Sequence, residues 1–292
     1  MRHHRSINIH KKYIDVAKKI SRYFSRIENA EAIVIGGSLA RGFYDDYSDI
    51  EMYVYYRGRM PNENKIRDIL NELNSSLTRS KKIFWFHKAW GHHTFFKVDE
   101  IKIELGYRNI EEINNRIDLF LNKFTLPQHG IHDTPFGHYE SGVANCILES
   151  IILHEKGDWI RKIRRKLKKY PHDLRKPTIK YYFRDANVIT KVKINQAVKR
   201  NDTLNFNACL ARVIRSLNIC LFALNKKYYP GDKWNSNYIH KFSLVPNNYM
   251  ENIEAILNRG QVSSRDKKYI LTLLNKIISD TKELINKSFK EE

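Results

Sequence analysis

The chain has 292 residues, of which 42% are hydrophobic, and 52 Lys and Arg outnumber 32 Asp and Glu to give a formal net charge of +20 at pH 7. This length and composition allow one large packed domain or two of ordinary size, and they exclude a chain too polar to form a core. The three cysteines form no CxxC pair and no zinc spacing, so we expect free thiols in a reducing compartment. No secretory leader or membrane-spanning run stands out, so we expect a cytoplasmic protein without a membrane partner.

The excess of basic residues has two interpretations. The functional one is a polyanionic partner such as nucleic acid, whose phosphates clustered Lys and Arg would neutralise. The other is compositional, because the chain is rich in Lys, Asn and Ile and much of its charge can lie on solvated helix surfaces. We favour the compositional interpretation and keep nucleic acid as an alternative partner.

The first predicted element is an amphipathic helix over residues 9–29, where apolar residues recur at helical spacing. Residues 33–56, IVIGGSLARGFYDDYSDIEMYVYY, then predict a strand, a glycine turn, a short helix, a loop and a second strand. Gly36 and Gly37 allow a sharp turn and the close approach of a ligand. We expect Ser38 to cap the helix with its hydroxyl, and the free N–H groups of the helix start suit a phosphate.

Two carboxylates open the second strand of this segment. Asp49 and Glu51 are two residues apart, so alternation along a strand places them on one face while Ile50 points into the core. Carboxylates side by side repel each other unless a cation lies between them. Because Mg²⁺ prefers oxygen ligands and is usually completed by substrate phosphates, the pattern predicts a magnesium and phosphate site.

Gly-Ser, followed after a gap by Asp-apolar-Glu-apolar, resembles the signature of the polymerase-β-like nucleotidyltransferase superfamily. The longer string GGSLARGFYDDYSDIE is similar to a bacterial branch with a helical C-terminal domain, and more distantly to lincosamide and aminoglycoside nucleotidyltransferases. The motif covers residues 36–52, and the rest of the chain resembles the branch more loosely. The alternative is a plain strand-turn-helix whose acids are solvated.

A predicted hairpin downstream supplies a third carboxylate. In its second strand Ile101, Ile103 and Leu105 alternate with polar residues and glycine, so Glu104 faces away from the apolar set. The superfamily has an acid, often Asp, between apolar residues on a later strand. The resemblance therefore implies that Glu104 is this acid, and Asp99 and Glu100 at the turn are weaker candidates.

The remaining elements are mostly helical in pattern. Residues 122–139 are irregular and contain His129, His132 and His138, which lack partner acids or cysteines at ligand spacing, so we interpret this segment as the connection into the second half. Strands are predicted over 82–90, 94–98 and 101–107, and helices over 62–77, 109–122, 142–157, 158–171, 174–200, 203–225, 248–257 and 264–287.

The resemblance implies an α+β fold in two parts. Residues 1–125 would form a nucleotidyltransferase catalytic domain of mixed sheet and helices, and residues 126–292 a helical substrate-binding domain. The implied activity is Mg²⁺-dependent transfer of a nucleoside monophosphate, with ATP as the expected donor. The expected acceptor is a hydroxyl of a small molecule, with aminoglycoside or lincosamide antibiotics as the named guess.

The resemblance also implies a role for each candidate residue. Asp49 and Glu51 would be catalytic metal ligands, and Glu104 would complete a second metal site or act as general base. The triphosphate would be held by Gly37, Ser38, Arg41 and Lys233. Two alternatives stay open: an acceptor that is a macromolecule, either an RNA end or a protein hydroxyl, and a protein that binds nucleotide or nucleic acid without catalysis. The intact trio of acids argues against the non-catalytic alternative.

Overall fold

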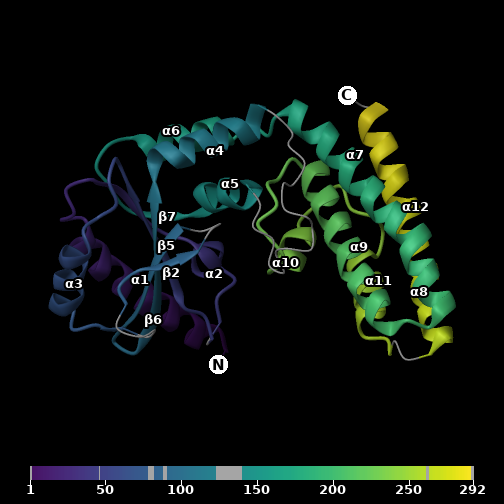
Figure 1. Ribbon diagram of the computed structural model, residues 1–292, viewed down its shortest axis with the longest axis horizontal. Helices are drawn as coiled ribbons and strands as arrows, with labels where there is room; N and C mark the ends of the chain where they lie inside the picture. Colours follow the sequence, from purple (N-terminus) through teal and green to yellow (C-terminus); the bar gives the residue numbers. More distant parts are fainter. Residues whose placement is uncertain are drawn as a thin grey trace. The chain divides into compact units, whose positions relative to one another are not determined.

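The computed structural model describes residues 2–45, 47–77, 82–87, 91–122, 140–260 and 263–290 (Figure 1). The chain forms two compact units, the first from Met1–Leu119 with Val143–Lys169 and the second from Phe120–Gly142 with Tyr170–Glu292. The predicted boundary between residues 125 and 126 differs from this division, because residues 143–169 return to the first unit. The predicted histidine segment, with His129, His132 and His138, lies outside the described residues.

A seven-stranded mixed sheet forms the centre of the first unit, in the order β3-β5-β6-β2-β1-β7 with β4 paired to β5. β2 and β6 run parallel, and the other pairs are antiparallel. The described strands are β1 Ala30–Ile35, β2 Ile50–Tyr56, β3 Ser76–Leu77, β4 Trp85–His87, β5 Gly91–Val98, β6 Ile101–Asn109 and β7 Ile151–Glu155.

One face of this sheet belongs to a core that α1 (Arg2–Phe24) and α3 (Glu63–Glu72) complete. β2 contributes Ile50, Met52 and Val54, all fully buried. Each such side chain stabilises the fold by roughly 1.5–3 kcal/mol relative to exposure. A shift of β2 by one residue would bring Glu51 into this core, so the burial pattern fixes the register.

The opposite face of the sheet is covered near the C-terminal end of β2. The ring of Tyr55 lies 4.8 Å from that of Trp159 in α6 (Trp159–Leu167). Trp159 donates a hydrogen bond of 2.9 Å to Asn114 in α4 (Ile110–Asn122), so α4 and α6 lie side by side, as Figure 1 shows. The polar residues at the start of β2 are on this same face.

β5 and β6 form the predicted hairpin. Its turn residues, Asp99 and Glu100, have φ values of 51° and 64°. Positive φ at both positions is typical of a two-residue type I′ turn, whose twist matches that of antiparallel strands. Glu104 is partly exposed between buried Ile103 and Leu105, which confirms that its side chain faces away from the core.

The prediction of a helix over residues 142–157 is wrong for its second half. α5 (Glu140–Glu149) ends at Glu149, and β7 follows as an antiparallel partner of β1. Ile151 and Ile152 suit a strand as well as a helix by composition, and the unpaired edge of β1 offers backbone hydrogen bonds that an extended chain can satisfy. This pairing returns residues 143–169 to the first unit.

The second unit is helical among its described residues. The helices are α7 His172–Val188, the π-helix η1 Ile189–Ile194, α8 Asn195–Arg200, α9 Thr203–Leu224, α10 Asn235–Ile239, α11 Tyr249–Leu257 and α12 Ser264–Lys290. α9 carries many of the fully buried side chains of this unit, which confirms that it is central. By length and composition α9 could also cross a membrane, contrary to our expectation, although 61% of its apolar window is buried in the unit, as in the core helix of a globular protein.

The fold class is therefore α+β, with a mixed sheet and helices followed by a helical C-terminal region, as predicted.

Candidate active site

The site is built on the glycine turn that follows β1. Gly36 donates a backbone hydrogen bond of 2.9 Å to the carbonyl of Glu51, which joins the turn to the start of β2. Gly37 has φ +59°, a conformation that favours glycine. A Cβ at Gly37 would lie 2.5 Å from Cδ of Glu51 and closer still to Oε2. The missing side chain therefore lets the Glu51 carboxylate lie directly against the turn.

Ser38 does not cap the short helix α2 (Gly37–Arg41), so this prediction is wrong. The N-cap is Gly36, and no side chain caps the helix. The helix begins at Gly37, two residues earlier than a Ser38 cap would require, so Ser38 lies within its first turn. The Ser38 hydroxyl donates instead to Oγ of Ser48, at 3.4 Å, in the loop before β2.

Glu51 and Glu104 lie opposite each other on neighbouring parallel strands. The register of β2 and β6 pairs Glu51 with Glu104, and it pairs the buried residues on either side with one another. Side chains at paired positions share a face, and adjacent strands are about 4.8 Å apart. The strand of Glu104 therefore neighbours that of Glu51. Asp49 lies one residue before β2 and is partly exposed, and its predicted role stays a prediction.

Sequence reasoning missed a histidine on the same face. Nδ1 of His93, in β5, lies 2.8 Å from Oε1 of Glu104. Nη2 of Arg108, in β6, lies 3.3 Å from Nε2 of the same ring, and the Arg108 guanidinium lies 5.0 Å from the ring centre of Tyr53. A strand extended back by one residue from the predicted 94–98, with its alternation, would have placed His93 on the face of Glu104.

Tyr53 and Cys146 are partly buried side chains close to the carboxylates. Burial raises the pKa of Tyr53 well above its ordinary value, and the neighbouring Cys146 and Glu51 raise it further, while Arg108 opposes them. Burial likewise raises the pKa of Cys146, in α5, to about 11, against the lowering effect of Arg41. At neutral pH both groups are therefore protonated and contribute no charge to the site.

The remaining predicted residues lie at the edge of this constellation or in the other unit. Nε of Arg41 forms an ion pair of 3.3 Å with Glu149 of α5. A phosphate would compete with Glu149 for the Arg41 guanidinium. Phosphate binding by Arg41 stays a prediction. Lys233 is exposed in the turn before α10, within the second unit, and its role also stays a prediction.

The donor chemistry around Glu51 suits a divalent cation. Within the described residues, no group of three or more His, Cys, Asp or Glu side chains is arranged to hold a metal ion. Mg²⁺ is usually bound through one or two carboxylates, with waters and substrate phosphates as the other ligands. Glu51 and Glu104 supply two such carboxylates, and the absence of a side chain at Gly37 lets Oε2 of Glu51 lie against the turn.

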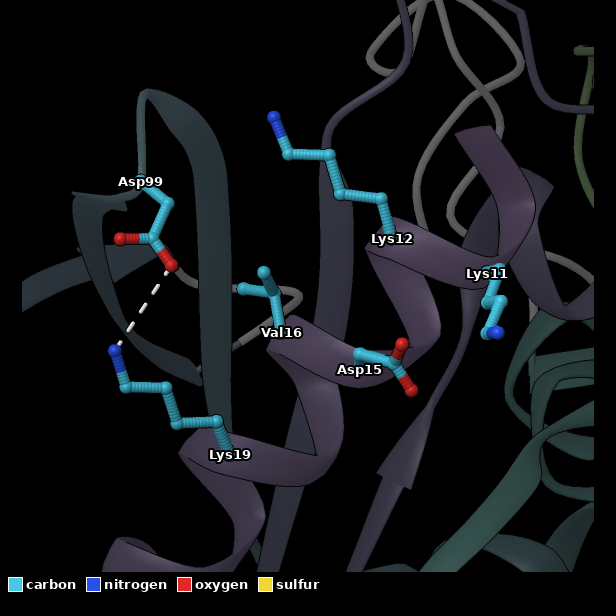
Figure 2. Close-up of a pocket in the computed structure, with 6 residues that line it drawn as sticks. All are labelled: Lys11, Lys12, Asp15, Val16, Lys19 and Asp99. Carbon is cyan, nitrogen blue, oxygen red and sulfur yellow. Dashed lines mark ion pairs between the residues drawn. The ribbon is translucent and has the colours of Figure 1, made fainter. Parts of the chain in front are cut away.

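A separate hollow of about 480 Å³ lies between α1 and the β5–β6 turn (Figure 2). Of the residues considered for the site, it contains Asp99, a weaker candidate for the third acid. Its charged side chains are exposed, and Nζ of Lys19 lies 3.9 Å from Oδ2 of Asp99 at its edge. The lining residues are Lys11, Lys12, Asp15, Val16, Lys19 and Asp99.

Comparisons with known proteins cover families, curated sequences and solved structures. A family model described as "Domain of unknown function (DUF4037)" matches residues 139–235. No curated protein matches the sequence significantly. Among solved structures, the chain is similar to a nucleotidyltransferase-like protein from Exiguobacterium sibiricum 255-15, with a TM-score of 0.45 and 9% sequence identity over 96% of this chain and 80% of that chain.

Proposed function

We propose that this protein is a Mg²⁺-dependent nucleotidyltransferase that moves a nucleoside monophosphate, AMP from ATP in the first instance, onto a hydroxyl of a small molecule. The observation that carries the proposal is the placement of Glu51. Its carboxylate lies against the glycine turn at Gly37 and opposite Glu104 on the neighbouring strand. A phosphate chain on the turn would therefore meet two carboxylates on the adjoining strands.

The reaction is an in-line displacement at the α-phosphorus. A bound Mg²⁺ would neutralise the charge of the triphosphate and hold the attacking and leaving oxygens in line. Asp49, Glu51 and Glu104 are the residues that we propose as its ligands. The acceptor oxygen forms a bond to the α-phosphorus, the bond to the bridging oxygen breaks, and pyrophosphate leaves. In the base role, Glu104 takes the proton of the acceptor hydroxyl.

The glycine turn and its neighbours would bind the triphosphate. Gly37 lies directly against Glu51 and Ser38 follows it in the first turn of α2, which supports the proposal that the backbone N–H of Gly37 and the Ser38 hydroxyl bind the phosphates. Arg41 and Lys233 are proposed further phosphate ligands, and Arg41 would exchange its pair with Glu149 for the phosphate.

Basic residues of α6 form ion pairs and hydrogen bonds within their own unit, which supports a small acceptor over nucleic acid. Arg161 pairs with Glu155 at 3.1 Å and Lys162 with Asp158 at 2.9 Å, and Lys166 pairs with Asp118. Arg164 instead donates to the carbonyls of Ile147 and Ser150. Much of this dense basic run therefore has partners within its own unit, which favours the compositional interpretation of the net charge.

The test is mass spectrometry of reactions that contain Mg²⁺, each of the four nucleoside triphosphates, and a panel of aminoglycosides, lincosamides and tRNA. We expect one triphosphate-dependent adduct of nucleotide mass on a small acceptor. Asp49→Ala and Glu51→Ala should each abolish the adduct and weaken Mg²⁺-dependent triphosphate binding, while the circular dichroism spectrum stays unchanged.

The outcomes separate the alternatives. An adduct on tRNA alone would replace the small acceptor with a macromolecular one. Triphosphate binding without any adduct would support the non-catalytic alternative. Wild-type affinity for the Mg²⁺-triphosphate complex in both alanine variants would refute the assignment of the site.

A further inference from the structure

His93 lies where it can reach two residues of the neighbouring strand. The register of β5 and β6 pairs it with Gly106, which lies midway between Glu104 and Arg108 on one face of β6. Diagonal neighbours on antiparallel strands are within reach of an aromatic ring. A Cβ at Gly106 would lie 3.2 Å from Nη2 of Arg108 and 2.9 Å from Cδ1 of Tyr53. Glycine at this position therefore leaves room for the ring and the guanidinium to meet.

The hydrogen-bonding capacity of arginine fixes the tautomer of this ring. A guanidinium only donates hydrogen bonds, so the contact of 3.3 Å between Nη2 of Arg108 and Nε2 of His93 makes Nε2 the acceptor. The hydrogen of the imidazole is then on Nδ1. Nδ1 lies 2.8 Å from Oε1 of Glu104, which is contact distance, although the two groups are not aligned as a hydrogen bond in this structure. Arg108 is itself held by the Tyr53 ring and by a hydrogen bond of 3.3 Å to the carbonyl of Tyr107.

The geometry points to a positioning relay, in which Arg108 fixes the tautomer of His93 and His93 holds the Glu104 carboxylate in one orientation beside Glu51. This inference rests on the proposed function and adds to it a residue that does not touch the substrate. The side chain of His93 is only 7% exposed, whereas that of Glu104 is 29% exposed. The His93 ring is thus buried, whereas the carboxylate that it orients is accessible to solutes.

The relay restricts the rotamers of Glu104, and a catalytic carboxylate needs such a fixed orientation. A glutamate has several rotatable bonds, and a base or ligand that samples many rotamers is aimed correctly for only part of the time. When the carboxylate is held in one rotamer before the substrate binds, the activation barrier is lower, because the side chain does not have to be reoriented in each turnover. Loss of a group that orients a functional ligand typically lowers activity by about 10- to 100-fold.

Two isosteric substitutions test which nitrogen matters. The amide nitrogen of asparagine falls near Nδ1 of histidine, and that of glutamine falls near Nε2. His93→Asn therefore keeps a donor facing Glu104, whereas His93→Gln moves the donor toward Arg108. We expect His93→Asn to retain kcat within about threefold, and His93→Gln to lower kcat by about 10-fold or more with little change in the KM for triphosphate.

His92 provides the matched control. It is the adjacent histidine on the opposite face of β5, where its ring lies 5.0 Å from that of Phe86. His92→Gln should leave kcat and KM near the wild-type values. Equal losses in His92→Gln and His93→Gln, or equal losses in His93→Asn and His93→Gln, would refute the relay, because neither depends on the position of the donor.

A measurement that does not depend on catalysis separates this inference from the proposed function. ¹⁵N NMR of the wild-type imidazoles, with the signals of His93 assigned by their loss in His93→Gln, should show hydrogen on Nδ1. Arg108→Met should abolish this preference. Hydrogen on Nε2 in the wild-type protein would refute the relay even if transfer is observed. A protein that shows the Nδ1 tautomer but no transfer would retain the relay and refute the enzyme.

Unfolding gives a second such measurement. In thermal unfolding, the loss of midpoint temperature in the double variant His93→Gln with Glu104→Gln should be smaller than the sum of the two single losses, because the second substitution removes a partner that is already lost. Additive losses would contradict a direct coupling between the two side chains.

Discussion

Replacement of Gly37 by alanine tests whether the Glu51 carboxylate really lies against the turn. At φ +59° an alanine costs about 1–2 kcal/mol in backbone strain. The added Cβ would also lie 2.5 Å from Cδ of Glu51, and relieving such an overlap in a packed site costs typically about 1–3 kcal/mol. We therefore expect Gly37→Ala to lower the free energy of unfolding by about 2–5 kcal/mol, the sum of these two costs.

Gly58 offers a control in which only the first cost applies. It has φ +66°, and a Cβ there would meet nothing within 4 Å. Gly58→Ala should therefore lose about 1–2 kcal/mol, and urea unfolding monitored by circular dichroism measures both variants. In a Glu51→Ala background the overlap with the carboxylate is gone and only the Cβ of residue 51, 3.1 Å from the added Cβ, stays close, so Gly37→Ala should cost clearly less than in the wild-type background. Equal losses for Gly37→Ala and Gly58→Ala in the wild-type background, or a loss at Gly37 that Glu51→Ala does not relieve, would refute the close approach.

Three further predictions follow from the site. Glu104→Gln should reduce turnover by about 10²-fold or more with a much smaller change in triphosphate affinity, and near-normal turnover would move the role to Asp99 or Glu100. Gel-shift titration with tRNA at two salt concentrations should show weak, salt-sensitive binding, in the micromolar range or worse at physiological salt. Tight, structure-selective binding at that salt would overturn the preference for a small acceptor. Because the pKa of Cys146 is raised in the folded protein, the native state keeps a thiol proton that the unfolded state loses, and the free energy of unfolding should fall between about pH 9 and 11. Cys146→Ala should reduce this decline. An unchanged slope would place the thiol in a less buried environment.

The sequence determined those features that depend on neighbours along the chain. A β-branched run that ends in two glycines forms β1 and its turn, because only glycine takes the positive φ of Gly37 without strain. Alternation of apolar residues in 101–107 placed Glu104 on the face opposite the core, and Asp99-Glu100 formed the turn between β5 and β6. In each case the pattern spans only a few residues, so the physical preference is local.

The tertiary structure alone decided which strands became neighbours. Glu51 and Glu104 meet because β2 and β6 pair in parallel, and this pairing joins segments some fifty residues apart whose own patterns carry no information on partner or register. The edge of β1 likewise turned residues 151–155 into a strand that composition alone did not distinguish from a helix. His93 acquired its place beside Glu104 and Arg108 in the same way, since a contact across strands depends on register and on the side chain that Gly106 lacks.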